Sequence, residues 1–403
     1  MADIEASMIE QAKAMAPRLR ERAAAAEQHR EIPAETAREL QEAGFYRILL
    51  PKRFGGLEGS FATAMEIAYE LARGCASSAW VYVNNAAHNL TLAAFPAAAQ
   101  EAFWGNGQGH RLAATGSSPR WTKCEVAPDG PEGGGYLLSG HWEFNSGIDS
   151  ADAVILSAMV GGRPDQLRFF LVMKEQYRRL DDWDTFGLKA TGSTSGIVEQ
   201  PLFIPEHLSQ PVGSMSRRSM PGEKLLPQGA GACDFAWAKV PFGTWYPHSL
   251  VPTMVGAAQG ALDYMRERIP QRTNVLGARP ADMQSVQLRL ADAQMKITMA
   301  RYLLLEDSLR DMEKFLARDE QPDLVSRGRW RANAAQAALL AREAITSLQY
   351  KAGAHAIFND QYLARQFRDV MAGTPHISMD WDVSGTLYGK ALLGIDTSKE
   401  PLH

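Results

Sequence analysis

The sequence predicts a mainly α-helical protein with a central β-domain. Residues 1–110 and the chain from about 251 onward carry apolar residues at the three- and four-residue spacing of amphipathic helices. Between them, short alternating or apolar runs are separated by glycine-rich turns, which is typical of a small antiparallel β-barrel or sandwich. We therefore expect an N-terminal helical domain (1–110), a middle β-domain (111–215), and a linker with a C-terminal helix-bundle domain (216–403).

Composition sets the broad class of protein. The chain has 403 residues, of which 45% are hydrophobic and 22% charged, and this balance suits a protein with a large core. The net charge is -4 and no Lys/Arg-rich run stands out, so we expect neither nucleic acid nor a membrane surface as a partner. The start of the chain lacks the apolar core of a signal peptide, and no apolar run approaches membrane-spanning length.

Three cysteines, Cys75, Cys124 and Cys233, stand far apart without a Cys-x-x-Cys pair. This spacing argues against a disulfide framework and against a zinc site, and we expect no metal. A reducing compartment fits such cysteines, so the expected location is the cytoplasm.

The N-terminal part begins as a series of helices. Gly44 stands where one helix ends, and Ser60 is placed to cap the next. Asn84 and His88 follow four residues apart, so they share one face of a later helix. Such a polar patch is either satisfied by neighbouring groups or contacts a substrate, and the sequence leaves both interpretations open.

Small hydroxyl residues beside glycine recur at three turns of the β-segment. They occur in Ala113-Ala-Thr-Gly-Ser (Thr115, Ser117), in Gly140-His-Trp-Glu-Phe-Asn-Ser-Gly (Ser146, Gly147) and in Gly187-Leu-Lys-Ala-Thr-Gly-Ser (Thr191, Ser193). Residues of this kind let a backbone approach a flat ring and hydrogen-bond to its edge. Ordinary β-turns favour the same residue types, so one such turn alone indicates nothing.

The C-terminal part carries two long seams of apolar residues. They comprise Met283, Val286, Leu290, Ala293, Ile297, Ala300 and Leu304, and then Ala334, Ala338, Ala341, Ile345 and Leu348. This spacing predicts a long antiparallel helix bundle, and bundles of this length often form oligomers. Before the bundle, aromatic residues that include Trp237 and Phe242 crowd together, either as interface packing or as the wall of an apolar substrate pocket.

Near the C-terminus, a Gly-Thr-Pro turn presents His376 between two helical segments. By itself this pattern is also that of an ordinary turn with a surface histidine. The chain lacks a Gly-x-Gly-x-x-Gly that follows a strand and opens a helix, and it lacks a Walker loop, Gly-x-Ser-x-Gly and His-Glu-x-x-His. We therefore expect no nicotinamide site in this chain.

Taken in order, these motifs resemble the acyl-CoA dehydrogenase fold, and in particular its flavin-dependent monooxygenase branch. Arg368-Asp-x-x-x-Gly-Thr is similar to the last motif of that fold, where dehydrogenases commonly carry the catalytic Glu just before Gly-Thr. Ala372 stands at that position here, and His376 follows four residues later. The resemblance covers nearly the whole chain, with departures from many relatives at Ser150 and Ala153.

The resemblance implies the oxygenase component of a two-component aromatic hydroxylase (group D). Such an enzyme takes reduced flavin from a separate NAD(P)H-dependent flavin reductase. It uses O2 through a C4a-(hydro)peroxyflavin to hydroxylate a phenolic or heteroaromatic small molecule. FMN is the expected flavin and FAD the alternative, because Ala352-Gly-Ala-His stands where dehydrogenases place glycines against the dinucleotide. The other functions left open are an N- or S-oxygenase of the same fold and an acyl-CoA dehydrogenase, against which Ala372 argues.

The same resemblance implies roles for individual residues in a homotetramer. The catalytic residues would be His376, which hydrogen-bonds the oxygen species or deprotonates a phenol, and Ser146, near flavin N5. The cofactor contacts would be Thr115, Ser117, Ser146, Gly147, Thr191 and Ser193. Arg272 and Gln284 would reach a flavin phosphate across a subunit boundary, although a structural salt bridge is the alternative for Arg272. Substrate contacts would come from Trp80, Asn84, His88, Trp237 and Phe242.

Overall fold

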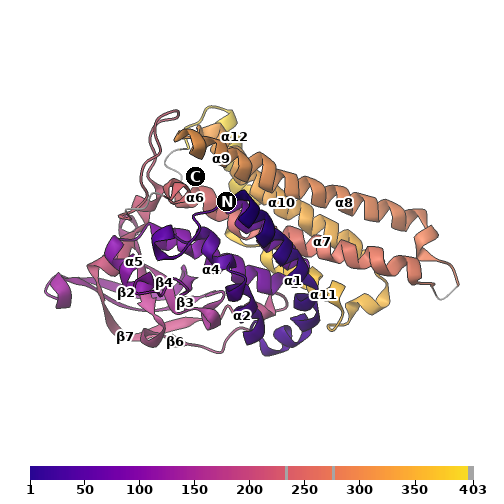
Figure 1. The fold of residues 1–403 in the computed structure, drawn as a ribbon, viewed down its shortest axis with the longest axis horizontal. Helices are drawn as coiled ribbons and strands as arrows, with labels where there is room; N and C mark the ends of the chain where they lie inside the picture. Colours follow the sequence, from indigo (N-terminus) through magenta and orange to yellow (C-terminus); the bar gives the residue numbers. More distant parts are fainter. Residues whose placement is uncertain (232–234, 275–276, 398–403) are drawn as a thin grey trace.

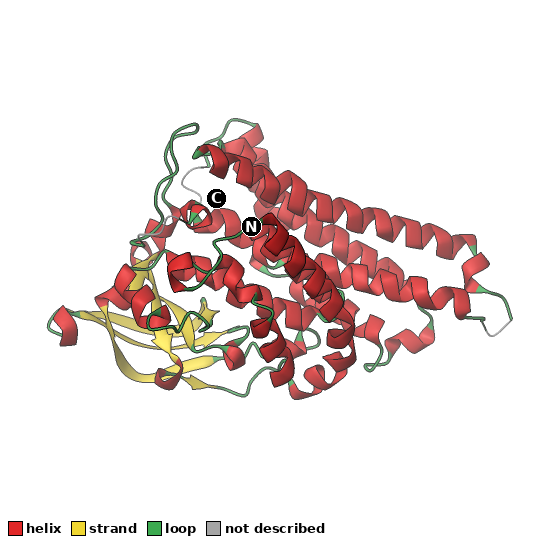
Figure 2. Ribbon diagram, viewed as in Figure 1, coloured by secondary structure: helices red, strands yellow, loops and turns green. Residues whose placement is uncertain are grey.

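The computed structural model describes residues 1–231, 235–274 and 277–397. The strands gather at one end of the molecule, and long helices extend away from them toward the opposite end (Figures 1 and 2). The N-terminal helices lie at the junction of these two parts (Figure 1). The predicted fold class, mainly α with a central β-domain, is confirmed, whereas the domain boundaries near residues 110 and 215 stay a prediction.

The N-terminal helices are built around α4. They are α1 (Ala2–His29), α2 (Ala34–Glu42), α3 (Phe61–Ala72), α4 (Ala76–Ala93) and α5 (Ala97–Trp104). Ser60 Oγ accepts a hydrogen bond from the Thr63 N–H over 3.2 Å, so the predicted cap of α3 is confirmed. Every residue of α4 is buried, because α3, α7 and strand β1 all pack against it.

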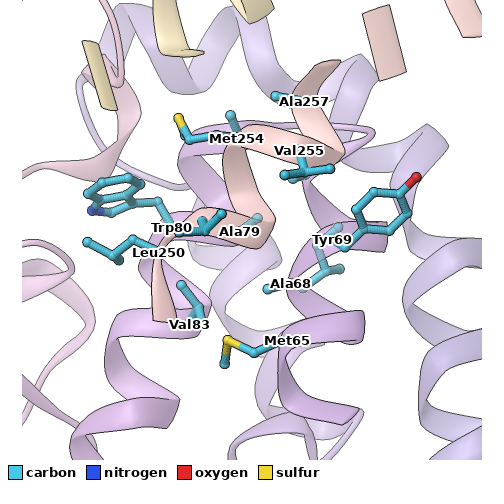
Figure 3. Packing of buried hydrophobic residues seen from close by; sticks show 14 of the residues in the cluster. Met65, Ala68, Tyr69, Ala79, Trp80, Val83, Leu250, Met254, Val255 and Ala257 are labelled. Atoms are coloured by element: carbon cyan, nitrogen blue, oxygen red, sulfur yellow. The ribbon is translucent and has the colours of Figure 1, made fainter. Parts of the chain in front are cut away.

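Figure 3 shows the core that α4 shares with its neighbours. Met65 of α3 and Val83 of α4 lie on one side, while Trp80 of α4 lies close to Leu250 and Met254 at the start of α7 (Figure 3). Apolar burial of this extent stabilises the fold by roughly 25 cal/mol per Å² of surface removed from water. The core therefore fixes the position of Trp80, which also takes part in the site described below.

The β-domain is a sandwich of two sheets. The strands are β1 (Ala113–Gly116), β2 (Ser118–Ala127), β3 (Gly135–Glu143), β4 (Ala153–Met159), β5 (Leu167–Met173), β6 (Arg178–Arg179), β7 (Gly196–Pro205) and β8 (Ser209–Pro211). Among the described residues, one sheet has the order β1-β4-β5-β8 and the other β2-β3-β7-β6. Trp142 of β3 is fully buried between them, and its Nε1 donates to the Ser157 carbonyl oxygen of β4 over 2.7 Å.

The expectation of purely antiparallel strands is wrong at one place. Strand β1 pairs with β4 in parallel, with Ala113 opposite Ala153. The reason is topological: the β2–β3 hairpin of the other sheet lies between them in sequence, so the chain crosses over before it returns beside β1. This crossover brings the turn after β3 close to the turn that follows β1.

The C-terminal helices form the long bundle. They are α6 (Phe242–Ser249), α7 (Val251–Arg268), α8 (Gln284–Leu304), α9 (Arg310–Arg318), α10 (Leu324–Lys351), α11 (Tyr362–Gly373) and α12 (Trp381–Leu392). Helix α10 packs along α7, α8 and α11, while α12 covers its first half (Figure 1). The predicted seam of α8 is confirmed at Val286, Ala293, Ile297, Ala300 and Leu304, which are all buried.

Cys75 and Cys124 are free and buried, and Cys233 lies outside the described residues. Across residues 1–231, 235–274 and 277–397, we find no helix with the length and apolar character needed to cross a bilayer.

Candidate functional site

Two of the glycine-rich turns and helix α4 meet in a chain of hydroxyl groups. Trp80 Nε1 donates to Ser146 Oγ over 3.0 Å, and Ser146 Oγ lies 2.7 Å from Ser193 Oγ. Ser193 Oγ lies 2.7 Å from Thr191 Oγ1, which donates to the Leu188 carbonyl oxygen over 2.8 Å. Residues that are far apart in the sequence thus form one continuous polar line.

The direction of these hydrogen bonds is fixed by their ends. A carbonyl oxygen only accepts, so the Thr191 hydroxyl donates to Leu188, Ser193 donates to Thr191, and Ser146 donates to Ser193. The indole N–H of Trp80 donates to Ser146 from the other end. The Ser146 oxygen is thereby left with one unused lone pair, and it can accept a hydrogen bond from an N–H or O–H of a ligand.

Glycines allow the two turns to approach each other. Gly147 and Gly192 have φ values of 75° and 53°, in the left-handed region that favours glycine. The Gly147 N–H donates to the Thr191 carbonyl oxygen over 3.2 Å, which ties the two turns together. A Cβ on Gly147 would lie 3.0 Å from Asn85 Oδ1 on α4, so the turn also fits closely against that helix.

An aromatic wall adjoins this hydroxyl chain at Trp80, which belongs to both. The ring of Trp80 meets the ring of His376 edge-on, with centroids 6.1 Å apart. Tyr246 lies 6.3 Å from His376 and stacks on Phe242 at 4.8 Å. Trp237 contacts a different ring, since it packs 5.1 Å from Phe61 in the N-terminal core.

His376 is positioned by the end of α11. That helix ends at Gly373, where a Cβ would fall 2.5 Å from Met254 Sδ and 3.2 Å from the Trp80 ring. The His376 N–H donates to the Gly373 carbonyl oxygen over 3.1 Å, which closes the predicted turn. The wall therefore depends on a glycine at the helix end.

The hydrogen bonds of His376 indicate its tautomer. Its Nδ1 accepts from the Ser378 N–H over 3.2 Å and lies 2.8 Å from Ser378 Oγ. The neutral ring therefore carries its proton on Nε2, which is the nitrogen left for a ligand. Burial lowers the pKa of His376 to about 4, so the imidazole is neutral at pH 7.

His88 and Asn84 are satisfied by the protein itself. His88 Nδ1 donates to the Ala113 carbonyl oxygen over 2.7 Å, and its Nε2 lies 3.1 Å from Thr115 Oγ1. Asn84 Nδ2 donates to the Trp80 carbonyl oxygen over 2.8 Å. Burial lowers the pKa of His88 to about 4, against the opposite effect of its bond to Ala113. Substrate contact at these two residues stays a prediction.

Comparison with known proteins places the chain in a family. The family model described as "Acyl-CoA dehydrogenase, N-terminal domain" matches residues 5–106, and "Acyl-CoA dehydrogenase, C-terminal domain" matches residues 249–381. The flavin-dependent monooxygenase oxygenase subunit HsaA of Rhodococcus jostii (strain RHA1) is 32% identical over 389 residues, which are 95% of this chain and 97% of that protein.

Two further similarities agree. The oxygenase component of the FADH(2)-dependent resorcinol hydroxylase of Rhizobium sp. (strain MTP-10005) is 32% identical, over 92% of this chain and 90% of that protein. The crystal structure of 3-HSA hydroxylase from Rhodococcus sp. RHA1 superposes with a TM-score of 0.87 at 29% identity, over 96% of this chain and 97% of that one.

This chain belongs to the flavin-dependent monooxygenases of the acyl-CoA dehydrogenase fold. The prediction of an oxidoreductase of this branch is therefore confirmed. Ala372 agrees with this identity, since a methyl group packed against Gly187 offers no base at the position where dehydrogenases commonly carry Glu.

The residues of this monooxygenase fit a flavin ring. A flavin is flat and carries polar atoms along one edge, and the site offers the hydroxyl chain together with the aromatic wall, which are joined at Trp80. Thr194 Oγ1, beside Ser193, is buried without a hydrogen-bond partner in the described part of the chain, so this turn has unused polar capacity. Ser117 is exposed between β1 and β2, and no described bond joins its hydroxyl to the hydroxyl chain.

Arg272 follows the end of α7, and Gln284 begins α8 of the monooxygenase; this end of the two helices lies away from the strands (Figure 1). Arg272 donates to the Ala352 carbonyl oxygen over 3.1 Å and borders a cavity of about 290 Å³ that His355 also lines. Gln284 is exposed at the first turn of α8. Within one chain, these two residues are not brought to the hydroxyl chain.

Sequence reasoning missed two members of this region. Tyr246 was visible only as one of a group of aromatic residues, because nothing in the sequence separated it from its neighbours. Asp369 was visible only as part of the Arg-Asp motif, and its carboxylate accepts the Leu188 N–H over 2.6 Å. That contact joins residues 181 positions apart, which no local pattern encodes.

Proposed function

We propose that this monooxygenase hydroxylates a phenolic small molecule with O2 and a reduced flavin delivered by a separate flavin reductase. The observation that carries the proposal is the hydroxyl chain, which ends in a free lone pair on Ser146 and adjoins an aromatic wall with a neutral His376. The relatives named as a resorcinol hydroxylase and a p-hydroxyphenylacetate 3-hydroxylase act on aromatic rings and support the substrate class.

Flavin, when bound, supplies the activation of O2 and the transfer of one oxygen atom. The role that we propose for Ser146 is to accept the N5–H of the reduced ring. The bond directions favour this role, since the hydroxyl proton of Ser146 is already donated to Ser193. Trp80 keeps Ser146 in place by donating to the same oxygen.

We propose that His376 acts as a hydrogen-bond donor through Nε2–H. A phenol has a pKa of about 10, and burial lowers the pKa of His376 to about 4. Full proton transfer from such a phenol to His376 would be uphill by roughly six pKa units, or about 8 kcal/mol. Of the two roles that the sequence left open, hydrogen bonding to the reacting oxygen is thus better supported than deprotonation of the substrate.

The aromatic wall would exclude water. Trp80, Tyr246 and Phe242 present apolar faces beside His376. Water exclusion matters in this chemistry, because hydrolytic loss of the activated oxygen yields hydrogen peroxide in place of product. The phenol ring would pack on the same faces through aromatic contacts.

The flavin that we propose is FMN, with FAD as the alternative. His355 beside Gly353 narrows the approach to Arg272, which favours the shorter cofactor. The resorcinol hydroxylase relative is named as FADH(2)-dependent, which favours the longer one. Dissociation constants for reduced FMN and reduced FAD, measured without oxygen, will decide between them.

We further propose a homotetramer in the cytoplasm. Helix α8 exposes one apolar face that a second copy would cover, made of Leu288 (63% exposed), Met295 (59%), Met299 (50%) and Tyr302 (61%). A neighbouring chain would also bring Arg272 and Gln284 to a flavin phosphate. The free thiols of Cys75 and Cys124 agree with a reducing compartment.

The experiment that tests this function supplies electrons from NADH through an added flavin reductase. The purified chain is mixed with NADH, FMN and a panel of phenols, with and without an unrelated flavin reductase, and products are measured by mass spectrometry under ¹⁸O2. We expect one ¹⁸O atom in the product only when the reductase is present. NADH oxidation by the chain alone, or peroxide without product across the whole panel, would overturn the proposal. Oxygenation of amines or sulfides instead of phenols would move the chain to the N- or S-oxygenases.

A further inference from the structure

Helix α11 directly supports the turn that runs from Leu188 to Ser193. Asp369 lies on this helix, is 2% exposed, and accepts the Leu188 N–H with Oδ1 over 2.6 Å. The preceding residue, Gly187, packs against the helix backbone, where a Cβ would fall 2.2 Å from the Arg368 carbonyl oxygen. The backbone at the start of the turn therefore packs directly against the backbone of α11.

Leu188 adopts a conformation that needs such support. Its φ is 52°, in the left-handed region that a residue with a branched side chain rarely adopts. Both of its backbone polar groups are engaged: the carbonyl oxygen accepts from Trp183 Nε1 over 3.2 Å and from Thr191 Oγ1 over 2.8 Å. Asp369 holds the remaining group, the N–H.

The two halves of the site meet through this contact. The hydroxyl chain begins at the Leu188 carbonyl oxygen and runs through Thr191 and Ser193 to Ser146. On the other side, α11 continues from Asp369 to Gly373 and then to His376. The hydrogen bond from the Leu188 N–H to the Asp369 carboxyl group therefore links the hydroxyl chain to the helix that leads to His376.

We propose that Asp369 is a positioning residue of this monooxygenase, which holds the Leu188–Ser193 turn at a fixed separation from His376. The proposal rests on the proposed function in one respect, namely that the fixed separation lets Ser146 and His376 act on the same flavin. Without the carboxylate, the left-handed Leu188 loses the partner of its N–H, and the turn relaxes away from α11. Ser146 and His376 then no longer act on the same reacting centre.

The charges around Asp369 define how the contact responds to pH. Glu27 of α1, Arg365 and Arg368 of α11 and Cys75 before α4 are the titratable groups that face it. Burial raises the pKa of Asp369 to about 7, and Glu27 adds to this rise, while Leu188 and the two arginines oppose it. Both arginines are themselves paired with Glu27, over 2.9 Å for Arg365 Nε.

The sign of the pH effect follows from that raised pKa. A carboxyl whose pKa is about 7 in the closed turn and near 3.8 when opened to water favours the closed state most at low pH. This contribution is lost as the pH rises toward 7, by up to about tenfold in the opening equilibrium per pH unit, and it levels off above 7. A turn without a titrating group at position 369 would show no such profile.

The test follows amide hydrogen exchange of residues 187–193 in the full chain, together with the affinity for reduced FMN. Asp369→Ala is expected to speed this exchange about 10- to 100-fold and to weaken FMN binding, because a buried N–H loses its only acceptor among the described residues. Asp369→Asn keeps an acceptor oxygen and stays neutral, so its exchange should match that of the wild type below about pH 4 and show no pH-dependent opening between pH 4 and 7. Asp323→Ala is the matched control, since it removes a 2.7 Å carboxylate bond to a backbone N–H at the start of α10.

Unchanged exchange and FMN affinity in Asp369→Ala would overturn the proposal. If Asp369→Ala does not fold, equal pH profiles of opening in the wild type and Asp369→Asn, after correction for intrinsic exchange, would overturn it as well. Neither measurement requires a substrate. A failure to oxygenate any phenol therefore counts against the proposed function, and a rigid turn in Asp369→Ala counts against this inference.

Discussion

The junction of α4, the β-sandwich and α11 contrasts with the far end of the helix bundle. At the junction, side chains from distant segments are already in contact, as in the bonds from Trp80 to Ser146 and on to Ser193. At the far end, Gln284 is exposed, and the described hydrogen bond of Arg272 goes to a backbone oxygen. Both regions were predicted to serve the same flavin.

The difference teaches what a single chain can organise. The junction is held by buried hydrogen bonds and by close packing at Gly147 and Gly373, and all of these contacts form within one chain. Arg272 follows the end of α7 and Gln284 begins α8, and this end of the two helices points away from the strands (Figure 1). On this account, the residues that act on the substrate come from one chain. The residues that bind the flavin phosphate come from a second chain.

The largest expected effect is that of His376→Ala. We expect product formation to fall by about 10²–10⁴-fold, because a positioned proton-donating group is lost from the reacting centre. Affinity for reduced flavin should stay close to that of the wild type, since the hydroxyl chain is untouched. Product by chromatography and peroxide by a coupled assay provide the measurement. Full product yield in the variant would reduce His376 to a turn residue.

The second largest effect is expected for assembly of subunits through the exposed face of α8. Met299→Glu places a charge on the exposed apolar face of α8 and should dissociate the assembly, as measured by analytical ultracentrifugation. Reduced-flavin affinity should fall about 10- to 100-fold in parallel, because the charged contact from Arg272 of the second copy is lost. Met220→Glu is the matched control, since Met220 is 67% exposed in the segment that hydrogen-bonds to Gln321 after α9. A wild type that is monomeric at micromolar concentration would contradict the two-chain account.

A smaller effect is expected for Ser146→Ala. It removes one neutral hydrogen bond, worth roughly 0.5–1.5 kcal/mol, so the ratio of product to peroxide should fall about two- to tenfold. Ser157→Ala is the control, because its hydroxyl donates to the Ser117 carbonyl oxygen within the same sandwich and outside the hydroxyl chain. An equal change in both variants would indicate a general loss of stability instead.

The smallest effect concerns pH. Burial lowers the pKa of His376 to about 4, so the product-to-peroxide ratio should show no step near pH 6.5 that depends on His376. For stability the sign is the reverse of that for Asp369: the contribution of His376 is present above pH 6.5 and is lost as the pH falls toward 4. Product yields at pH 6, 7 and 8, compared between wild type and His376→Ala, provide the check. A step near pH 6.5 that disappears in the variant would contradict the lowered pKa.

Much of the fold was predictable because it follows from local patterns. The seam of α8 and the cap at Ser60 are written in the spacing and type of neighbouring residues. The turns that carry Ser146 and Thr191 were also predictable as glycine-hydroxyl motifs, although their meeting depended on the resemblance to a family. The parallel pairing of β1 with β4 was missed, since strand direction depends on the path of the whole chain.

The rest of the site could not be predicted because it depends on burial and on distant contacts. An unperturbed histidine titrates near pH 6.5, and only the packing around His376 shows that its pKa is lower. The bond from Asp369 to Leu188 spans 181 positions. Arg272 stays a prediction for a different reason: its expected partner is a flavin held mainly by another chain.

The most direct test of the contrast compares His376→Ala with Arg272→Ala at saturating reduced flavin. The ratio of product to peroxide is measured in both variants, after the flavin concentration has been raised well above each dissociation constant. If chemistry belongs to the junction and flavin retention to the far end, Arg272→Ala recovers the wild-type ratio, while His376→Ala forms peroxide at every flavin concentration. A wild-type ratio in His376→Ala, or a loss in Arg272→Ala that saturating flavin does not repair, would contradict the account.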